Sequence, residues 1–187
     1  MPVTTTRTLP AAILREVQKA VIGKDLVLTK VLLAFLAGGH VLMEDMPGVG
    51  KTTLAMAFSK ALGLNCRRVQ FTPDVLPSDL TGFSVYEKNT GTFVFQPGAL
   101  FCHLLLADEI NRTSSKTQAA LLEAMEEGNV TVEGKTYTLP RPHLVIATQN
   151  PLGCVGTQSL PESQLDRFLM RLHMGYPEIQ DEVAILK

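Results

Sequence analysis

Residues 44–53 read EDMPGVGKTT, and this stretch decides the fold class. It matches the phosphate-loop pattern G-x-x-x-x-G-K-[ST] except at the first glycine, which is replaced by Asp45. The apolar run HVLME precedes it, and KTTLAMAFSKAL follows as a predicted helix. A strand, a glycine turn and a helix N-terminus together aim backbone N–H groups at one point. The context therefore predicts a phosphate cradle; the alternative is a glycine turn of structural use only.

Each part of the loop has an expected role. Gly48 and Gly50 allow close approach of the backbone, Lys51 reaches the β- and γ-phosphates, and the Thr52 hydroxyl binds Mg²⁺. A carboxylate pointing into the cradle would repel phosphate, so we expect Asp45 to face outward. The candidate nucleotide contacts of the loop are Pro47, Gly48, Val49, Gly50, Lys51, Thr52 and Thr53.

A pair of acids follows a second apolar run, LLLADEINR. A nucleotide hydrolase needs one carboxylate to hold Mg²⁺ and another to orient or deprotonate the attacking water. Adjacent strand residues point to opposite sides, so both acids serve one site only where the strand ends. The sequence places Asp108 and Glu109 at such an end, and the alternative is two solvated acids after a core strand.

Asn150 follows a third apolar run, in HLVIATQNP. In an open parallel sheet, ligands bind outside the carboxyl ends of the strands. The Asn150 amide is therefore a candidate partner of the γ-phosphate or of the attacking water. An Asx turn before Pro151 is the alternative.

Arg167 lies near the end of a predicted helix in LPESQLDRFLMR. Its guanidinium is a candidate arginine finger, which would stabilise the charge of the transition state. The spacing of the motif does not show whether Arg167 acts on the nucleotide of its own chain or on that of a neighbouring subunit. A surface salt bridge to Asp166 or Glu162 is the alternative.

The composition is that of one soluble domain. Of the 187 residues 45% are apolar and 19% charged, and the net charge of −1 gives no reason to expect nucleic acid or a membrane surface. The longest apolar stretch, LVLTKVLLAFLAGG, is too short to span a bilayer. Three widely spaced cysteines, Cys66, Cys102 and Cys154, suit a reducing compartment. We expect a cytoplasmic protein.

The order of elements predicts an α/β fold. Apolar strand-like and helical runs alternate, which favours a parallel sheet covered on both faces. Two β-hairpins interrupt the alternation, FSVYE with TFVFQ and NVTVE with KTYTL. We expect a flexible N-terminus over residues 1–9 and a single core over 10–187. The final PEIQDEVAILK looks like a helix whose apolar pattern is still running at the chain end.

These motifs, in this order, resemble the MoxR family of AAA+ ATPases, which is related to the magnesium-chelatase ATPase subunits. The specific stretches are VIGK, GGHVLMEDMPGVGKT, VQFTPDVLPSDLTG, LLLADEINR, KTQAALLEAMEE, ATQNP and LPESQLDRFLM. The resemblance implies a P-loop core that binds ATP or ADP with Mg²⁺, and it places VIGK near the adenine. The roles it implies are Walker A for Lys51 and Thr52, Walker B for Asp108 and Glu109, sensor 1 for Asn150, the inserted finger for Arg167, and base contacts for Val21, Ile22 and Gly23.

The resemblance also implies a setting for the activity. Such proteins form hexameric rings and act as chaperones on protein partners, in assembly or metal-cofactor insertion, often beside a von Willebrand factor A-domain protein. Two departures matter here: Asp45 replaces the leading Walker A glycine, and the helical lid with its sensor 2 arginine would lie beyond Lys187. We therefore expect weak nucleotide binding, weak hydrolysis and poor ring assembly from this chain.

Two other functions remain open on the sequence. A nucleic-acid translocase would use similar hairpins, but each hairpin here carries one lysine and is no basic tract. The other alternative is a module that binds a nucleotide at the phosphate loop but hydrolyses it very slowly. Guanine is also not excluded, because no base-reading motif is present and adenine rests on the resemblance.

Overall fold

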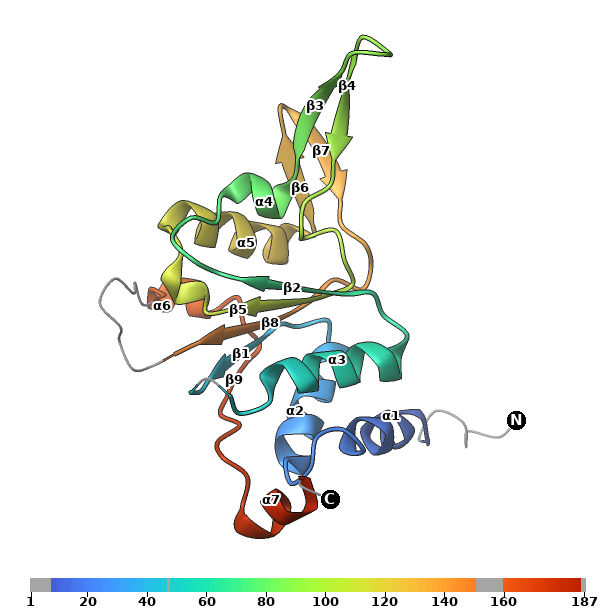
Figure 1. The fold of residues 1–187 in the computed structure, drawn as a ribbon, viewed down its shortest axis with the longest axis vertical. Helices are drawn as coiled ribbons and strands as arrows, with labels where there is room; N and C mark the ends of the chain where they lie inside the picture. Colours follow the sequence, from blue (N-terminus) through green and yellow to red (C-terminus); the bar gives the residue numbers. More distant parts are fainter. Residues whose placement is uncertain (1–7, 47, 151–159, 186–187) are drawn as a thin grey trace.

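Five parallel strands form the central sheet of the computed structural model, which describes residues 8–46, 48–150 and 160–185. Helices cover both faces of this sheet (Figure 1), and the predicted α/β class is confirmed. In the order in which they lie side by side, the strands are β2 (Cys66–Gln70), β5 (Leu104–Asp108), β8 (Leu144–Gln149), β1 (Val41–Glu44) and β9 (Met170–Leu172).

The helices divide between the two faces of the sheet (Figure 1). One face packs against α1 (Thr8–Gln18), α2 (Asp25–Leu36) and α3 (Lys51–Leu62). The other packs against α4 (Pro77–Thr81) and α5 (Ser115–Glu127). The remaining short helices are η1 (Ile110–Arg112), α6 (Glu162–Leu165) and α7 (Ile179–Ile185). The result is a three-layer arrangement with one core on each side of the sheet.

The apolar strand runs explain this double core. Successive side chains of a strand point to opposite faces, so a strand buried on both sides must be apolar throughout. In β5, Leu104 and Leu106 join the cluster beneath α1, α2 and α3. Leu105 and Ala107 join the cluster beneath α5. All five residues of β5 are buried, as the sequence pattern predicts.

Parallel pairing brings the polar strand ends to one edge. Glu44 at the end of β1 pairs with Gln149 at the end of β8. Gln70 at the end of β2 pairs with Asp108 at the end of β5. Because the carboxyl ends of parallel strands share an edge, residues that lie far apart in the sequence meet there. This edge carries the candidate site.

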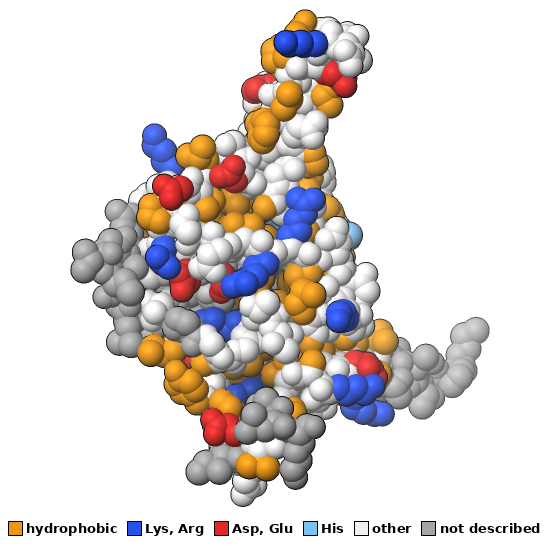
Figure 2. Space-filling model, viewed as in Figure 1, with side chains coloured by type: hydrophobic (Ala, Val, Ile, Leu, Met, Phe, Trp, Pro, Cys, Tyr) orange, Lys and Arg blue, Asp and Glu red, His pale blue; other side chains and the backbone are white. Residues whose placement is uncertain are grey.

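Two β-hairpins project from the α5 side (Figure 1). They are β3 (Phe83–Glu87) with β4 (Thr92–Gln96), and β6 (Asn129–Val132) with β7 (Lys135–Thr138). Phe95 stacks on Tyr137 with ring centroids 3.8 Å apart, which joins the two hairpins at their base. Farther out, Tyr86 and Phe93 form an exposed edge-to-face pair, and Figure 2 shows hydrophobic side chains on this projection.

One detail differs from the sequence-based expectations. The first helix begins at Thr8, inside the segment 1–9 that we expected to be flexible, because Pro10 is tolerated in the first turn of a helix. That helix ends at Gln18. Among the described residues, no helix combines the length and the apolar character needed to cross a bilayer.

Candidate functional site

The phosphate-loop segment turns sharply between β1 and α3. Gly48 and Gly50 have φ values of 88° and 93°, in the left-handed region that glycine adopts at no steric cost. A Cβ added at Gly48 would meet no atom within 4 Å, so the space against the backbone is open to a ligand. Of the expected loop contacts, Pro47 lies outside the described residues. The N-terminus of α3 follows directly, as an anion site requires.

Two cavities meet at this loop, and both are lined by Gly48 and Gly50. The small cavity, of about 330 Å³, is completed by six residues with polar or charged side chains: Lys51, Thr52, Arg68, Gln70, Asp108 and Glu109. The large cavity, of about 570 Å³, is completed by Ala20, Val21, Ile22, Lys24, Val49, Thr53, Met174, Tyr176, Pro177 and Glu182. The neighbouring residues Thr52 and Thr53 thus face different cavities from the first turn of α3.

Lys51 is the first residue of α3, and its side chain is buried. Its ammonium donates to the backbone oxygens of Asp45 at 2.9 Å and Met46 at 3.2 Å. Burial lowers the pKa of Lys51, and the charges of Asp108, Asp45 and Glu109 oppose that shift. The ammonium therefore lies in the field of both acids, at the wall of the small cavity.

The backbone leaves its strand between the two acids. Glu109 has φ 57° and ψ 49°, a left-handed conformation that is uncommon for a residue with a side chain. This turn brings the Glu109 carboxylate to the cavity that Asp108 also lines. The buried Thr148 hydroxyl holds the arrangement, because it accepts from Glu109 N–H at 2.9 Å and donates to Asp108 Oδ1 at 2.8 Å. The predicted strand end is the physical reason that both acids serve one cavity.

Two residues of the small cavity were not predicted from the sequence. Arg68 donates to Asp108 Oδ2, and Gln70 donates to Glu109 Oε2 at 3.1 Å. Glu109 Oε2 also accepts from Arg112 at 2.6 Å. A signal for Arg68 and Gln70 existed, because polar residues two apart on a strand share one face. Recognising it required knowing that β2 lies beside β5.

The Asp45 side chain points away from the cradle, as the loop motif led us to expect, but it is buried and does not face solvent. Its carboxylate is buried and accepts the backbone N–H groups of Met174 at 2.6 Å and Gly175 at 3.0 Å. The charge is thus directed at the chain beyond β9 and not into the cradle. The physical reason is that β9 pairs with β1, which brings unbonded N–H groups within reach of position 45.

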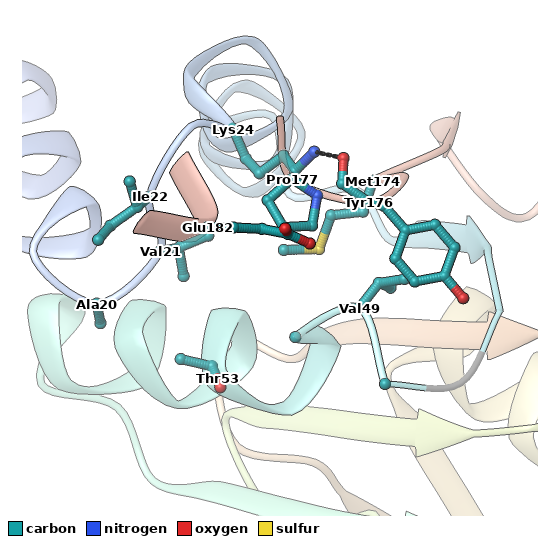
Figure 3. Close-up of a pocket in the computed structure, with 12 residues that line it drawn as sticks. Ala20, Val21, Ile22, Lys24, Val49, Thr53, Met174, Tyr176, Pro177 and Glu182 are labelled. Carbon is teal, nitrogen blue, oxygen red and sulfur yellow. Dashed lines mark hydrogen bonds between the residues drawn. The ribbon is translucent and has the colours of Figure 1, made fainter. Parts of the chain in front are cut away.

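The large cavity has a mainly apolar lining (Figure 3). Val21 and Ile22 come from the segment between α1 and α2, Val49 from the loop, and Met174 from the chain beyond β9. Polar groups at its edge include Lys24, which donates to the backbone oxygen of Tyr176 at 2.7 Å. An apolar pocket of this size with a few polar groups at its edge suits a planar aromatic ligand.

Gly23 was expected to contact the base and does not line this cavity. Its φ of 72° suits glycine, and an added Cβ would overlap the Asp181 carboxylate of α7. The residue therefore serves the packing of α7 against the turn before α2. Val21 and Ile22, the other two candidate base contacts, do line the cavity.

Asn150 and Arg167 lie outside both cavities as the described residues define them. Asn150 follows β8 at the same edge of the sheet, and its backbone oxygen accepts from Asn111 Nδ2 at 3.3 Å. Arg167 lies two residues beyond the end of α6 and pairs with Glu126 of α5 at 2.9 Å. The surface salt bridge considered for Arg167 thus exists, but with a residue distant in the sequence.

The residues of the small cavity suit a metal ion bound with phosphates. Thr52, Asp108 and Glu109 offer the hard oxygen atoms that Mg²⁺ prefers. Lys51 and Arg68 place positive charge on the same cavity wall, where phosphate oxygens would lie. The open backbone over Gly48 completes a cradle that a side chain at that position would narrow.

Comparison with known proteins agrees with this geometry. The profile of the ATPase family associated with various cellular activities (AAA) matches residues 40–170. A Bacillus subtilis protein of uncharacterised function, YeaC, is 53% identical over 91% of this chain and 53% of its own length. The chaperone MoxR1 of Mycobacterium tuberculosis is 42% identical over 96% of this chain and 47% of its own length.

A solved structure has the same fold. The crystal structure of a proposed ATPase from Cytophaga hutchinsonii matches with a TM-score of 0.87 and 42% sequence identity. The match covers 96% of this chain and 55% of that one. The chain therefore spans about half the length of the curated relatives and of the solved structure that it matches.

Proposed function

Because the chain belongs to the MoxR family of AAA+ ATPases, we propose that it binds ATP with Mg²⁺ and hydrolyses it. The observation that supports this most directly is the meeting of the two cavities at Gly48 and Gly50. In this proposal the triphosphate occupies the small cavity and the adenosine the large one. The apolar side chains of Val21, Ile22 and Val49 then contact the base.

The side chains of the small cavity have separate tasks. Lys51 turns from the Asp45 and Met46 carbonyls to the β- and γ-phosphates. Thr52 and Asp108 would hold the metal ion, which would neutralise negative charge on the phosphates. Glu109 orients the attacking water and takes its proton, after its carboxylate leaves Gln70 and Arg112. Asn150, at the end of β8, contacts the γ-phosphate or that water.

Phosphate release tests the hydrolysis. Glu109→Gln keeps the shape of the side chain but removes the base, so kcat should fall about 100-fold while nucleotide affinity stays similar. Lys51→Ala should weaken nucleotide binding at least about tenfold, because the phosphates lose their buried cation. Glu87→Gln, at an exposed position of the β3–β4 hairpin, is the matched control and should behave like wild type.

Equal phosphate release by the wild-type chain and by Glu109→Gln would contradict hydrolysis at this site. It would favour a nucleotide-binding module with little turnover. Competition of ATP and GTP for the same site tests the base, and a preference for GTP would contradict the adenine assignment. The test compares variants and does not depend on a high absolute rate of phosphate release, because the chain spans about half the length of these relatives.

We propose that the active assembly is a homo-hexamer in which Arg167 acts on the nucleotide of the neighbouring subunit. Arg167 lies beside Glu126 and, in the part of the chain that the structure describes, lines neither cavity, which supports action across an interface. Mixing Arg167→Ala with Lys51→Ala tests this, because each variant supplies what the other lacks. Restored phosphate release in the mixture is expected, and activity no higher than that of the separate variants would count against it.

We further propose that hydrolysis remodels a protein partner in the cytoplasm, with a von Willebrand factor A-domain protein as one candidate. The name of the relative MoxR1 as a chaperone supports a protein client. The exposed Tyr86 and Phe93 on the β3–β4 hairpin offer apolar contacts. An unfolded protein should stimulate phosphate release, and Phe93→Ser should reduce the stimulation.

A gel-shift experiment tests the alternative of a nucleic-acid translocase. The chain should not shift single-stranded DNA, and a salt-dependent shift would favour a translocase.

A further inference from the structure

Asp45 joins the start of the phosphate loop to the chain beyond β9. Each oxygen of its buried carboxylate accepts one backbone N–H: Oδ2 from Met174 at 2.6 Å and Oδ1 from Gly175 at 3.0 Å. Hydrogen bonds from N–H groups to a charged acceptor are stronger than those between neutral partners. The connection is therefore specific, and a glycine at this position would offer no acceptor.

The segment that Asp45 holds is a wall of the large cavity. Met174, Tyr176 and Pro177 line that cavity, opposite Val21 and Thr53 (Figure 3). The Met174 side chain also lies against the loop, because a Cβ added at Gly50 would come within 3.6 Å of its Cε. The two hydrogen bonds of Asp45 thus connect this wall directly to the start of the loop.

The backbone of the same residue contacts Lys51, which lines the small cavity. The Asp45 carbonyl oxygen accepts from the Lys51 ammonium at 2.9 Å. Asp45 therefore lies between the lysine on the phosphate side and the wall on the nucleoside side. Its negative charge is also close enough to oppose the lowering of the Lys51 pKa by burial.

We propose that Asp45 is a positioning residue that holds the nucleoside-side wall against the phosphate loop. The inference rests on the proposed binding of ATP and adds that the affinity for ATP depends on Asp45. Binding of the nucleoside part requires the Asp45 carboxylate, whereas binding of the phosphate part does not. The replacement of the leading glycine is, in this view, a functional feature of the loop.

Glu44, the last residue of β1, supplies a matched control, because its carboxylate has other partners than that of Asp45. Its carboxylate pairs with Arg171 of β9 at 2.7 Å and with the Gln149 amide. Arg171 and Gln149 lie outside both cavities as the described residues define them. Glu44→Gln therefore loosens the same β1–β9 connection without touching the cavity wall.

The test compares the affinities of ATP and inorganic tripolyphosphate, a ligand that has no nucleoside. Both are measured by calorimetry with Mg²⁺ for wild type, Asp45→Asn, Asp45→Gly and Glu44→Gln. The ratio of the tripolyphosphate Kd to the ATP Kd should fall about tenfold in both Asp45 variants, a change equivalent to about 1.4 kcal/mol. Glu44→Gln should leave the ratio within about twofold of wild type while lowering the melting temperature.

Other outcomes overturn the proposal. Equal tightening of both ligands in Asp45→Asn would mean that Asp45 acts only by repelling phosphate. Equal weakening of both, with the ratio unchanged, would mean a purely structural role. A wild-type chain that binds neither ligand would refute the proposed function.

Hydrogen exchange tests the role of Asp45 without any ligand. Exchange at the Met174 and Gly175 amides should accelerate in Asp45→Asn but not in Glu44→Gln. Unchanged protection of these amides in Asp45→Asn would overturn the inference.

Discussion

The Arg68 guanidinium donates two hydrogen bonds to a single oxygen of Asp108, from Nε at 3.0 Å and from Nη2 at 2.7 Å. The other oxygen of Asp108 accepts from Thr148 at 2.8 Å. The Asp108 side chain is 10% exposed and that of Arg68 is 52% exposed, so only the arginine can move freely into solvent. A metal ion at Asp108 would meet the positive charge of Arg68, and we expect the two to compete.

Replacing Arg68 should change the dependence of nucleotide binding on Mg²⁺. In Arg68→Gln, the Mg²⁺ concentration for half-maximal binding of ATP should fall about threefold, because the competing cation is gone. Affinity for ATP without metal should fall about threefold, since the phosphates lose a positive charge. Titration of a fluorescent ATP analogue over a series of Mg²⁺ concentrations measures both. Arg67→Gln, at an exposed residue that bonds to the Gly98 carbonyl, should change neither quantity.

Thr148 should be needed for both stability and turnover. Thr148→Val leaves the Glu109 N–H and Asp108 Oδ1 without the hydroxyl, which should cost about 1–3 kcal/mol in unfolding free energy. Thr148→Ser retains the hydroxyl and should recover most of the phosphate-release rate. Chemical denaturation and steady-state kinetics report the two effects. Equal turnover by the valine and serine variants would show that the hydroxyl does not orient the acids.

Acidification should destabilise the fold through His40. Its Nδ1 accepts from Val145 N–H at 3.1 Å, so Nε2 carries the proton and faces the Met125 carbonyl. Burial lowers the pKa of His40 from its ordinary value of 6.5, and the nearby His143 lowers it further against the effect of the Met125 bond. Below pH 6.5 the unfolded chain binds a proton that folded His40 does not, so stability present above that pH is lost as the pH falls.

The free energy of unfolding should therefore decrease between pH 7.5 and 5.5, with His40 contributing a slope of at most about 1.4 kcal/mol per pH unit. Denaturant titrations at several pH values measure it. His40→Gln keeps a donor for Met125 but binds no proton in this range, so its profile should be flatter. His143 also has a pKa lowered by burial, so some slope should remain. An identical slope in His40→Gln would contradict the assignment.

Two phenylalanines should differ sharply in their effect on stability. Phe58 is fully buried and packs edge-to-face on Phe35 at 5.5 Å, so Phe58→Ala should cost about 3–5 kcal/mol. Phe93 is 71% exposed and pairs with Tyr86 across the hairpin, so Phe93→Ala should cost less than about 1 kcal/mol. Thermal or chemical unfolding measures both. A large loss from Phe93→Ala would mean that the hairpin packs more closely than its exposure indicates.

Several elements of the fold follow directly from local patterns. The run LLLAD predicts a strand buried on both faces, and all five residues of β5 are buried. The alternation of such runs with helices predicts the parallel sheet that the structure contains. The end of helix α1 was not predictable in this way, since Val17 and Val21 are both buried although the helix ends at Gln18.

The sequence by itself determined the α/β class, the position of the phosphate loop and the acid pair at a strand end, because these depend on neighbours along the chain. Only the tertiary structure decided which distant residues join them. Arg68 and Gln70 reach the acids because β2 lies beside β5, and Asp45 turns away from the cradle because β9 lies beside β1. Strand order depends on packing across the whole core, which no local pattern encodes. The partners of these charged groups therefore become visible only in the folded chain.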